Sequence, residues 1–225
     1  RIVTPRLDLV PATATLVQAE MEGPRRLRRL LGVRVADDWP PEAMVEALPV
    51  FRAALERRPE LAGWFSWYWV LRGRGAGRTA PSGPSAGEVG DPRENWEGGG
   101  EPGGGQGAVG LDVLIGCGGF TGPPEEGQVE IGYEVLAPYR RCGYATEAVR
   151  ALLAWAFSHD DVETVVAETG ADNAASLAVL AKLGFTRARG PSPSGQIGFV
   201  LEATTSSFIG GQACVRRSDG GQRRL

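Results

Sequence analysis

The sequence predicts a mixed α/β (α+β) domain built around one twisted sheet. Runs of β-branched, aromatic and other apolar residues are typical of strands. Between them lie stretches whose apolar residues recur at helical spacing, as in residues 146–158. The chain has 225 residues, and 42% of them are hydrophobic, which is enough for one core. We therefore expect residues 1–202 to form a single domain.

The N-terminal part is expected to alternate a strand, two helical segments and a second strand. Residues 2–10 alternate apolar and polar side chains, as a half-buried strand does. Helical spacing continues over residues 12–31, with a break expected near Gly23-Pro24, and again over residues 41–58. Residues 64–71 are aromatic and apolar, which favours a strand.

The C-terminal part is expected to contain the remaining strands and two further helices. Residues 109–120 and 128–136 predict an antiparallel pair joined by a turn at residues 122–124. Helices are predicted at 146–158 and 174–183, and further strands at 162–169, 185–189 and 196–202. Gly184 can take the left-handed conformation that ends the second helix.

Two segments are too poor in apolar residues to pack on this core. From residue 73 to 107, 13 of 35 residues are glycine and four are proline. Such a segment cannot bury enough apolar area to offset the entropy of ordering it, so we expect a flexible insertion within the domain. Residues 203–225 are expected to be a disordered tail.

Composition argues against several classes of partner. The net charge is −3 and no long basic tract occurs, so nucleic acid is not expected as a partner. Three cysteines and the single His159 show no metal-ligand spacing, and no metal site is expected. No apolar run reaches the ~20 residues of a membrane span, and no signal-peptide pattern occurs. We expect no membrane partner and a cytoplasmic location.

Two patterns resemble binding motifs but are better explained by packing. Residues 116–122 are rich in glycine, yet the spacing of a dinucleotide-binding loop is missing and no helix pattern follows. The aromatic residues at positions 64–69 could stack on bases, but no basic groove accompanies them. We therefore reject a dinucleotide-binding loop, and expect the aromatic residues to pack in the core and in the wall of the cleft.

The most informative stretch runs from Arg140 to Ala145. It follows the strand at 128–136 and opens the helix at 146–158. A turn rich in backbone N–H groups at a helix N-terminus binds phosphate well. Gly143 has no Cβ and lets the backbone approach an anion, while Arg140 and Arg141 add positive charge. The stretch is predicted to hold a diphosphate.

A second element, Asp172 to Ser176, precedes the last helix and completes a known pattern. The two elements in this order resemble the GNAT superfamily of acyl-CoA-dependent N-acetyltransferases, and most closely its RimJ/RimL-like branch. Arg140-x-x-Gly143-x-Ala145 fits the cofactor signature of that family. The Gly132-Tyr133 pair, the Thr146–Val149 helix start, the Asn173-x-x-Ser176 element and the opening strand at residues 4–9 fit the branch.

The resemblance implies a GNAT fold that binds acetyl-CoA. Its mixed sheet would have six or seven strands and about four flanking helices. The fourth and fifth strands, at 128–136 and 162–169, would splay apart around the acyl donor. No metal is implied. The implied cofactor-binding residues are Glu134, Val135, Leu136, Arg140, Arg141, Cys142, Gly143, Tyr144, Ala145, Thr146, Asn173 and Ser176.

Acyl transfer to an amine needs a group that removes a proton from the amine and one that protonates the departing thiolate. Glu168, at the open end of its strand, is the first candidate for the base. Glu130 and Glu134 compete with it, as do a base elsewhere and direct loss of the proton to water. Ser176 is the candidate acid or, alternatively, a hydroxyl of the helix cap. Asn173 is expected to be the N-cap, accepting from the Ser176 N–H, and the resemblance implies that it also contacts the cofactor. Relatives with a tyrosine seven residues after the Asn use it as the acid, but this chain has Leu180 there.

The expected reaction is transfer of an acetyl group to a primary amine. The favoured acceptor is the α-amine of a protein N-terminus, and a small amine such as an aminoglycoside or a polyamine is the alternative. A non-catalytic acyl-CoA sensor would keep the phosphate-binding stretch without a working acid and base. Either a monomer or a homodimer is compatible with the sequence.

Overall fold

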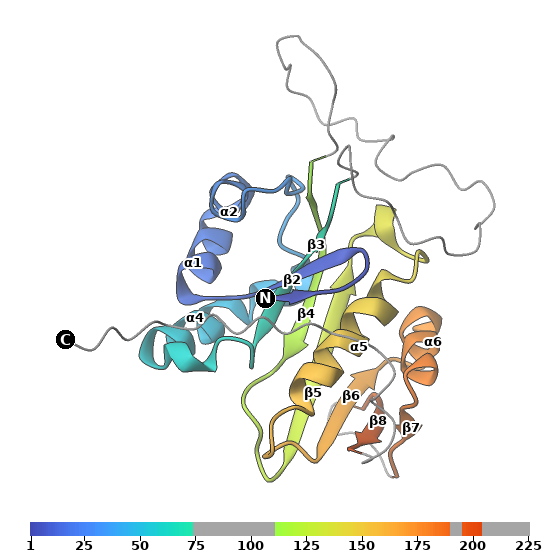
Figure 1. Ribbon diagram of the computed structural model, residues 1–225. Helices are drawn as coiled ribbons and strands as arrows, with labels where there is room; N and C mark the ends of the chain where they lie inside the picture. The colour runs from blue at the N-terminus through green and yellow to red at the C-terminus, as the bar shows by residue number, and fades with distance from the viewer. Residues whose placement is uncertain (74–110, 190–194, 204–225) are drawn as a thin grey trace.

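The computed structural model describes residues 1–73, 111–189 and 195–203, which form one open sheet with helices on both faces (Figure 1). The strand order is β1-β2-β3-β4-β5-β6-β8-β7. Neighbouring strands are antiparallel except β5 and β6, which run parallel. The strands are β1 (Ile2–Val3), β2 (Leu7–Pro11), β3 (Ser66–Leu71), β4 (Val113–Phe120), β5 (Gln128–Val135), β6 (Thr164–Thr169), β7 (Thr186–Arg187) and β8 (Ile197–Glu202).

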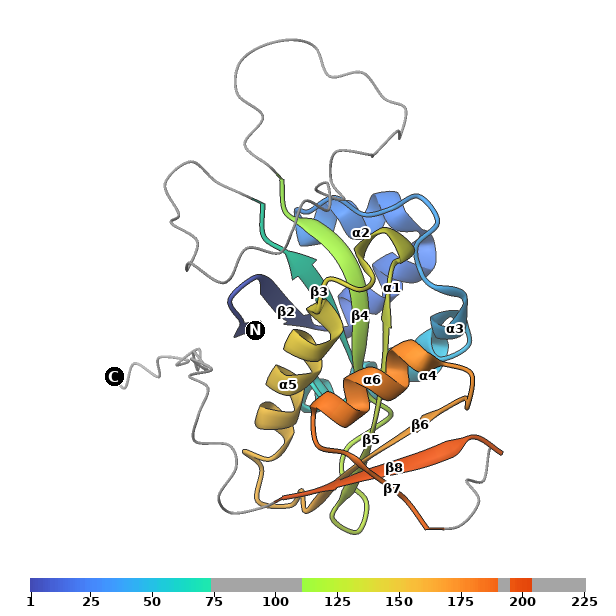
Figure 2. The same ribbon diagram turned by 90° about the vertical axis from the view of Figure 1, so that its right-hand side faces the viewer.

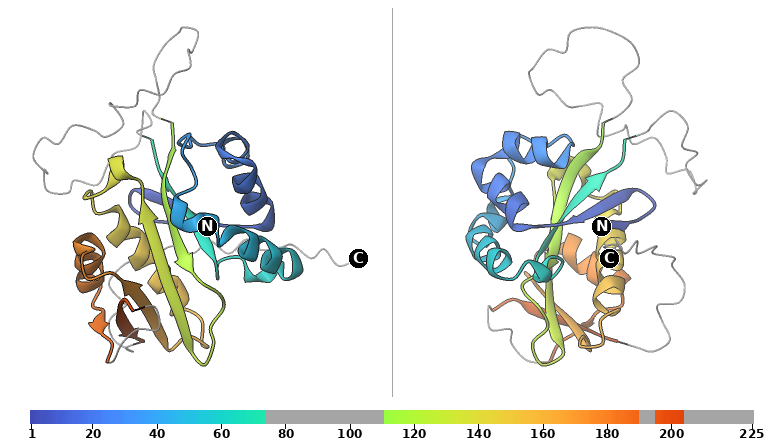
Figure 3. Two further views of the ribbon diagram at one scale, coloured as in Figure 1. Left: turned by 180° about the vertical axis from the view of Figure 1, so that it is seen from behind. Right: turned by 60° about the vertical axis from the view of Figure 1, so that its left-hand side comes forward.

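The helices form two layers. Helices α1, α2 and α4 lie on one face of the sheet, and α5 and α6 lie on the other (Figures 1 and 3). The α-helices are α1 (Ala14–Glu22), α2 (Pro24–Leu31), α3 (Glu42–Val45), α4 (Leu48–Arg57), α5 (Tyr144–Ala156) and α6 (Ala174–Lys182). There are also two short 3₁₀ helices. The first, η1 (Pro59–Leu61), precedes β3, and the second, η2 (Ala137–Tyr139), precedes the turn that leads into α5.

The mixed fold expected from the sequence is confirmed, with eight strands in place of six or seven. The additional strand arises because residues 2–11 form a hairpin rather than one strand, with Ile2 paired to Leu9. The helix expected over 41–58 is interrupted between α3 and α4, where Pro49 follows in the first turn of α4. The expected insertion at 73–107, beyond Gly73, and the expected tail at 203–225, beyond Ala203, lie outside the described residues.

The aromatic residues of β3 are part of the core, as expected. Trp67, Tyr68 and Trp69 are at most 2% exposed, so they cannot serve as a surface for stacking bases. Trp67 and Trp64 pack against Trp155 of α5, with ring centroids 5.4 and 4.7 Å apart. This aromatic cluster joins the middle of the sheet to the C-terminal end of α5.

The glycines of β4 also serve packing. All eight residues of the strand are buried. A Cβ at Gly118 would lie 2.5 Å from Cβ of Tyr133 and 2.7 Å from the Trp69 ring. At Gly119 it would lie 2.0 Å from the carbonyl oxygen of Phe65. These glycines let neighbouring strands approach each other closely, which agrees with the rejection of a dinucleotide-binding loop at residues 116–122.

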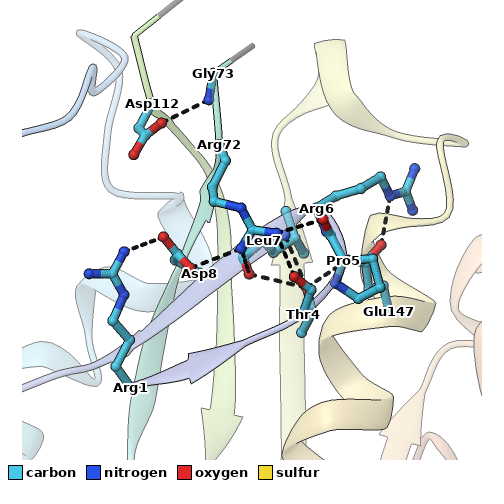
Figure 4. Close-up of polar contacts among 10 residues, drawn as sticks. All are labelled: Arg1, Thr4, Pro5, Arg6, Leu7, Asp8, Arg72, Gly73, Asp112 and Glu147. Atoms are coloured by element: carbon cyan, nitrogen blue, oxygen red, sulfur yellow. Dashed lines mark hydrogen bonds and ion pairs between the residues drawn. The ribbon is translucent and has the colours of Figure 1, made fainter. Parts of the chain in front are cut away.

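The turn between β1 and β2 is held by Arg72, which follows β3 (Figure 4). Its guanidinium donates hydrogen bonds to the Asp8 carboxylate at 2.9 Å and to the carbonyl oxygens of Thr4, Pro5 and Leu7. Asp8 is 4% exposed and also pairs with Arg1. Because its backbone is fixed in this way, the turn presents Arg6 to the first turn of α5.

Candidate active site

The sheet opens between β5 and β6. These parallel strands are in register over only three pairs, from Gln128–Thr164 to Glu130–Val166, and then diverge. Figure 2 shows β6 running away from β5 toward the start of α6. A cavity of about 290 Å³ lies where the strands part, beside the N-terminal end of α6. Its lining residues are Ile131, Gly132, Tyr133, Ala167, Glu168, Thr169, Gly170, Asn173, Ser176 and Gln196. The expected divergence between 128–136 and 162–169 is thus present and holds a cavity.

One side of this opening belongs to the face of the sheet that α1 covers. Tyr68, Cys117 and Glu134 are in register across β3, β4 and β5, and the Tyr68 hydroxyl donates to Glu20 of α1 at 2.6 Å. Because side chains alternate along a strand, Glu130 and Gly132 share the face of Glu134. Val166 is paired with Glu130, so Glu168, two residues on, lies on this face too. We call it the α1 face.

The other side belongs to the face that α5 and α6 cover, which we call the α5 face. Trp67 and Tyr133 flank Gly118 in register, and Trp67 packs on α5. Tyr133 therefore points to the α5 face, where its hydroxyl lies 3.0 Å from the hydroxyl of Ser176 on α6. The Glu168 carboxylate and the two hydroxyls therefore reach the opening from opposite faces of the sheet.

The turn from Arg140 to Gly143 lies at the C-terminal end of β5 and is open to solvent. Arg141 and Gly143 both have positive φ, 64° and 80°, so the chain passes twice through the left-handed conformation. Gly143 is the N-cap of α5 and has no side-chain cap. Among the described residues, the N–H groups of Arg141, Cys142 and Gly143 have no backbone acceptor. Free N–H groups in such a turn at a helix N-terminus suit an anion.

The two arginines of the turn differ in their roles. The Arg140 guanidinium folds back on β5, where Nε donates to the Val135 carbonyl oxygen at 2.8 Å and Nη2 lies 3.5 Å from Glu134. Arg140 therefore fixes the end of the strand. Arg141 is exposed and forms no ion pair with any described residue, so its charge is available to a bound anion.

Arg6 adds a further positive charge beside this turn (Figure 4). Its Nε donates to Glu147 of α5 at 2.6 Å, and its Nη1 donates to the Cys142 carbonyl oxygen at 2.9 Å. Its guanidinium also lies over the Tyr144 ring, 4.4 Å from the centroid. Nη2 would be 3.5 Å from a Cβ at Gly143. Arg6 both neutralises Glu147 and holds the carbonyl side of the turn.

The free edge of β5 restricts which backbone groups can pair with a ligand. The Leu136 N–H donates to Ile115 of the neighbouring strand at 2.9 Å, and the Glu130 carbonyl oxygen accepts from Thr121 at 3.1 Å. Because the direction of the backbone groups alternates, those of Glu134 also point to β4. Of the three residues expected to pair with a ligand, only Val135 directs its groups to the opening, and Tyr133 joins it.

The three candidate carboxylates have different surroundings. Glu168 lines the cavity, beyond the last residue of β6 that pairs with β5. Glu130 lies before the strands part. Burial raises the pKa of Glu130, and the negative charge of Glu168 raises that pKa further. Glu134 is paired with Arg140 and does not line the cavity.

Asn173 and Ser176 lie together at the start of α6, as the sequence predicts. The Asn173 side chain accepts a hydrogen bond from the Ser176 N–H at 3.1 Å, so it is the N-cap of the helix. Both residues also line the cavity. The capping role is therefore confirmed, while contact of Asn173 with a cofactor stays a prediction.

Known proteins share this combination of fold and sequence. Residues 93–186 match the model of the family described as Acetyltransferase (GNAT) domain. The chain carries a GNAT acetyltransferase domain. Over 183 residues, 81% of this chain and 87% of its relative, it is 28% identical to the uncharacterized N-acetyltransferase YjdG of Bacillus subtilis (strain 168).

Solved structures agree with this GNAT assignment at the level of the fold. One is the acetyltransferase from Agrobacterium tumefaciens str. C58, with a TM-score of 0.50, 19% identity and coverage of 90% of this chain and 95% of that one. Another is a putative ribosomal-protein-serine acetyltransferase from Vibrio cholerae, with a TM-score of 0.50, 17% identity and coverage of 90% and 97%.

Two residues of the candidate site were not predicted from the sequence. Tyr133 was noted as part of a Gly-Tyr pair but was given no chemical role, although alternation along β5 places it opposite Glu130 and Glu134. Arg6 was interpreted only as part of the opening strand, and nothing local indicates that it contacts residues 142–147.

In the part of the chain that the structure describes, no three metal-ligating side chains cluster and no helix could span a membrane.

Proposed function

We propose that this GNAT enzyme transfers the acetyl group of acetyl-CoA directly to a primary amine. One observation carries the proposal: the exposed turn at residues 140–143 follows, after η2, the same strand whose free edge borders the cavity, and Arg140 binds back to the end of that strand. A diphosphate bound by the turn and a thioester in the cavity could thus belong to one extended molecule. The residues of the turn fit this group, because Arg141 and the free N–H groups complement its negative charge.

The two faces of the opening suit the two halves of the reaction. On the α1 face, Glu168 takes the proton of the attacking amine, directly or through a water molecule. On the α5 face, Ser176 supplies the proton to the departing thiolate. Val135 and Tyr133 of β5 offer backbone groups along the free edge, where a strand N–H can stabilise the developing charge on the carbonyl oxygen.

The favoured acceptor is the α-amine of a protein N-terminus. An α-amine has a pKa of about 7.7–8.0, against about 10.4 for the side chain of lysine, so one carboxylate base suffices near neutral pH.

Two measurements test the proposal. Titration calorimetry should detect acetyl-CoA binding, and a thiol-release assay should detect turnover. The acceptors are peptides with a free α-amine, the same peptides with the α-amine blocked and a lysine present, a polyamine and an aminoglycoside. Turnover that disappears on α-amine blocking supports the proposed acceptor. Binding without turnover on any acceptor indicates a sensor, and no binding by folded protein refutes the acetyl-CoA assignment.

Arg6→Gln is expected to weaken acetyl-CoA binding roughly three- to tenfold. A tenfold loss corresponds to about 1.4 kcal/mol. The substitution leaves the Glu147 carboxylate, which is mostly buried, without its cation beside the phosphate-binding turn. Titration at low and high salt measures the effect, which should shrink at high salt. Arg58→Gln removes an exposed ion pair elsewhere and is the control.

A double substitution separates two explanations of the Arg6 effect. If Arg6 acts by neutralising Glu147, adding Glu147→Gln should restore most of the lost affinity. If the double variant binds as weakly as Arg6→Gln, Arg6 contacts the phosphate itself or holds the turn through Cys142. Unchanged affinity in the single variant rules out any contribution of Arg6.

A further inference from the structure

The two hydroxyl groups in the cavity face each other from different elements. Tyr133 is on β5 and Ser176 is on α6, and their oxygens are 3.0 Å apart. Both side chains are partly exposed and both line the cavity. A hydrogen bond across the opening therefore joins the α5 face of the strand to the start of α6.

The phenol of Tyr133 is held firmly in place. Its ring stacks on Trp69, with centroids 6.3 Å apart and planes inclined by 24°. Trp69 is fully buried. Gly118, between them, leaves room for both side chains, because a Cβ there would lie within 2.7 Å of each. Burial raises the pKa of Tyr133, and the hydrogen bond between its hydroxyl and that of Ser176 only partly offsets this. The phenol is therefore protonated at neutral pH and can donate.

Ser176 is fixed from the other side. Its N–H is bound by the Asn173 cap at 3.1 Å, so the backbone of the first helical turn cannot rotate freely. Its hydroxyl can donate one proton and accept at its lone pairs. If Tyr133 donates to the Ser176 oxygen, the Ser176 proton is free to point into the cavity. Leu180, buried one turn further along α6, has no hydroxyl to offer.

We propose that Tyr133 is a positioning residue that orients the Ser176 hydroxyl toward the thioester sulfur and replaces its proton. As the C–S bond of the thioester breaks, its electron pair goes to sulfur, which takes the proton from the Ser176 oxygen. That oxygen takes the Tyr133 proton in the same step. The Tyr133 phenolate then regains a proton through water. Its source is the proton that Glu168 took from the amine, so protons balance. This inference rests on the proposed acetyl transfer.

A panel of four variants tests this role. Tyr133→Phe keeps the ring and its stacking on Trp69 but removes the hydroxyl. We expect kcat to fall about 10- to 100-fold, at or below the lower end of the ~10²- to 10⁴-fold range for a group that itself transfers the proton, because Tyr133 acts through Ser176. The dissociation constant of acetyl-CoA and the melting temperature should change little. Ser176→Ala should lower kcat at least as much. Ser158→Ala, which removes a hydroxyl at the far end of α5, is the control and should be neutral.

The double variant decides whether the two hydroxyls act together. If Tyr133 works through Ser176, Tyr133→Phe/Ser176→Ala should be no slower than Ser176→Ala alone. If the kcat losses of the two single variants multiply in the double variant, Tyr133 acts independently of Ser176 and the proposal is overturned. Wild-type kcat in Tyr133→Phe would overturn it too. A loss confined to acetyl-CoA affinity would indicate a purely structural hydrogen bond. Failure of the proposed function is distinct, because the wild-type protein would then show no turnover.

Discussion

Glu168→Gln is expected to lower kcat about 10²- to 10³-fold, within the range for loss of a general base. The substitution keeps the size of the side chain and removes only its ability to take a proton. The loss should be greatest below the pKa of the acceptor amine, where most of the amine is an ammonium ion. It should shrink as the pH rises through that pKa, because the free amine then needs no base. Steady-state rates between pH 6 and pH 10, a span chosen to be about two units either side of an α-amine pKa, measure this.

The position of Glu168 favours it over its two competitors. It lies beyond Val166, the last residue of β6 in register with β5, and so belongs to the part of the strand that borders the cavity. Glu130 is still within the paired region. Glu134 pairs with Arg140, and its backbone groups point to β4 rather than to the opening. Among the three carboxylates, Glu168 can reach a substrate with the least rearrangement.

Glu130→Gln and Glu134→Gln are the matched controls. We expect each to lower kcat less than fivefold. A group that transfers the proton contributes about 10²-fold or more to the rate, and a carboxylate away from the reacting atoms makes no such contribution. Burial and the charge of Glu168 raise the pKa of Glu130, so Glu168→Gln should also bring that pKa down toward its usual value. If Glu130→Gln gives the larger loss and Glu168→Gln leaves the pH profile unchanged, the base is Glu130.

The elements of the site were predictable because their signals are local. The turn at 140–143 is marked by a strand before it, a helix after it and a glycine whose φ is 80°. The cap of α6 depends on Asn173 and Ser176, three residues apart. Alternation along β5 assigns Glu130 and Glu134 to one face. Each of these inferences needs only a few neighbouring residues.

The contacts that complete the site join residues far apart in sequence. Arg6 and Glu147 are separated by 141 positions, and Tyr133 and Ser176 by 43. Period and propensity fix the face of a strand, but they do not fix which loop lies above a helix N-terminus. The hairpin of β1 and β2 was likewise missed, because alternation over residues 2–10 is the same for one strand as for two short ones.

Gly119→Ala is expected to lower the free energy of unfolding by about 3 kcal/mol, the upper part of the usual range for overpacking a core. The new Cβ would lie 2.0 Å from the Phe65 carbonyl oxygen, which is backbone and cannot rotate away. That carbonyl also accepts the Phe120 N–H at 3.2 Å, so moving it breaks a hydrogen bond. For a domain of this size the melting temperature should fall by roughly 6–12 °C.

Gly122→Ala is the control, because it lies just beyond β4 and a Cβ there would meet nothing within 4 Å. Its stability should be unchanged or higher by about 0.4–1 kcal/mol, since alanine restricts the unfolded chain. Thermal and urea unfolding of the two variants distinguish crowding from loss of glycine as such. Equal stability of both variants would mean that β3 and β4 are not in the register described. The arrangement of Trp67, Gly118 and Tyr133 would then fail with it, because all three positions depend on that register.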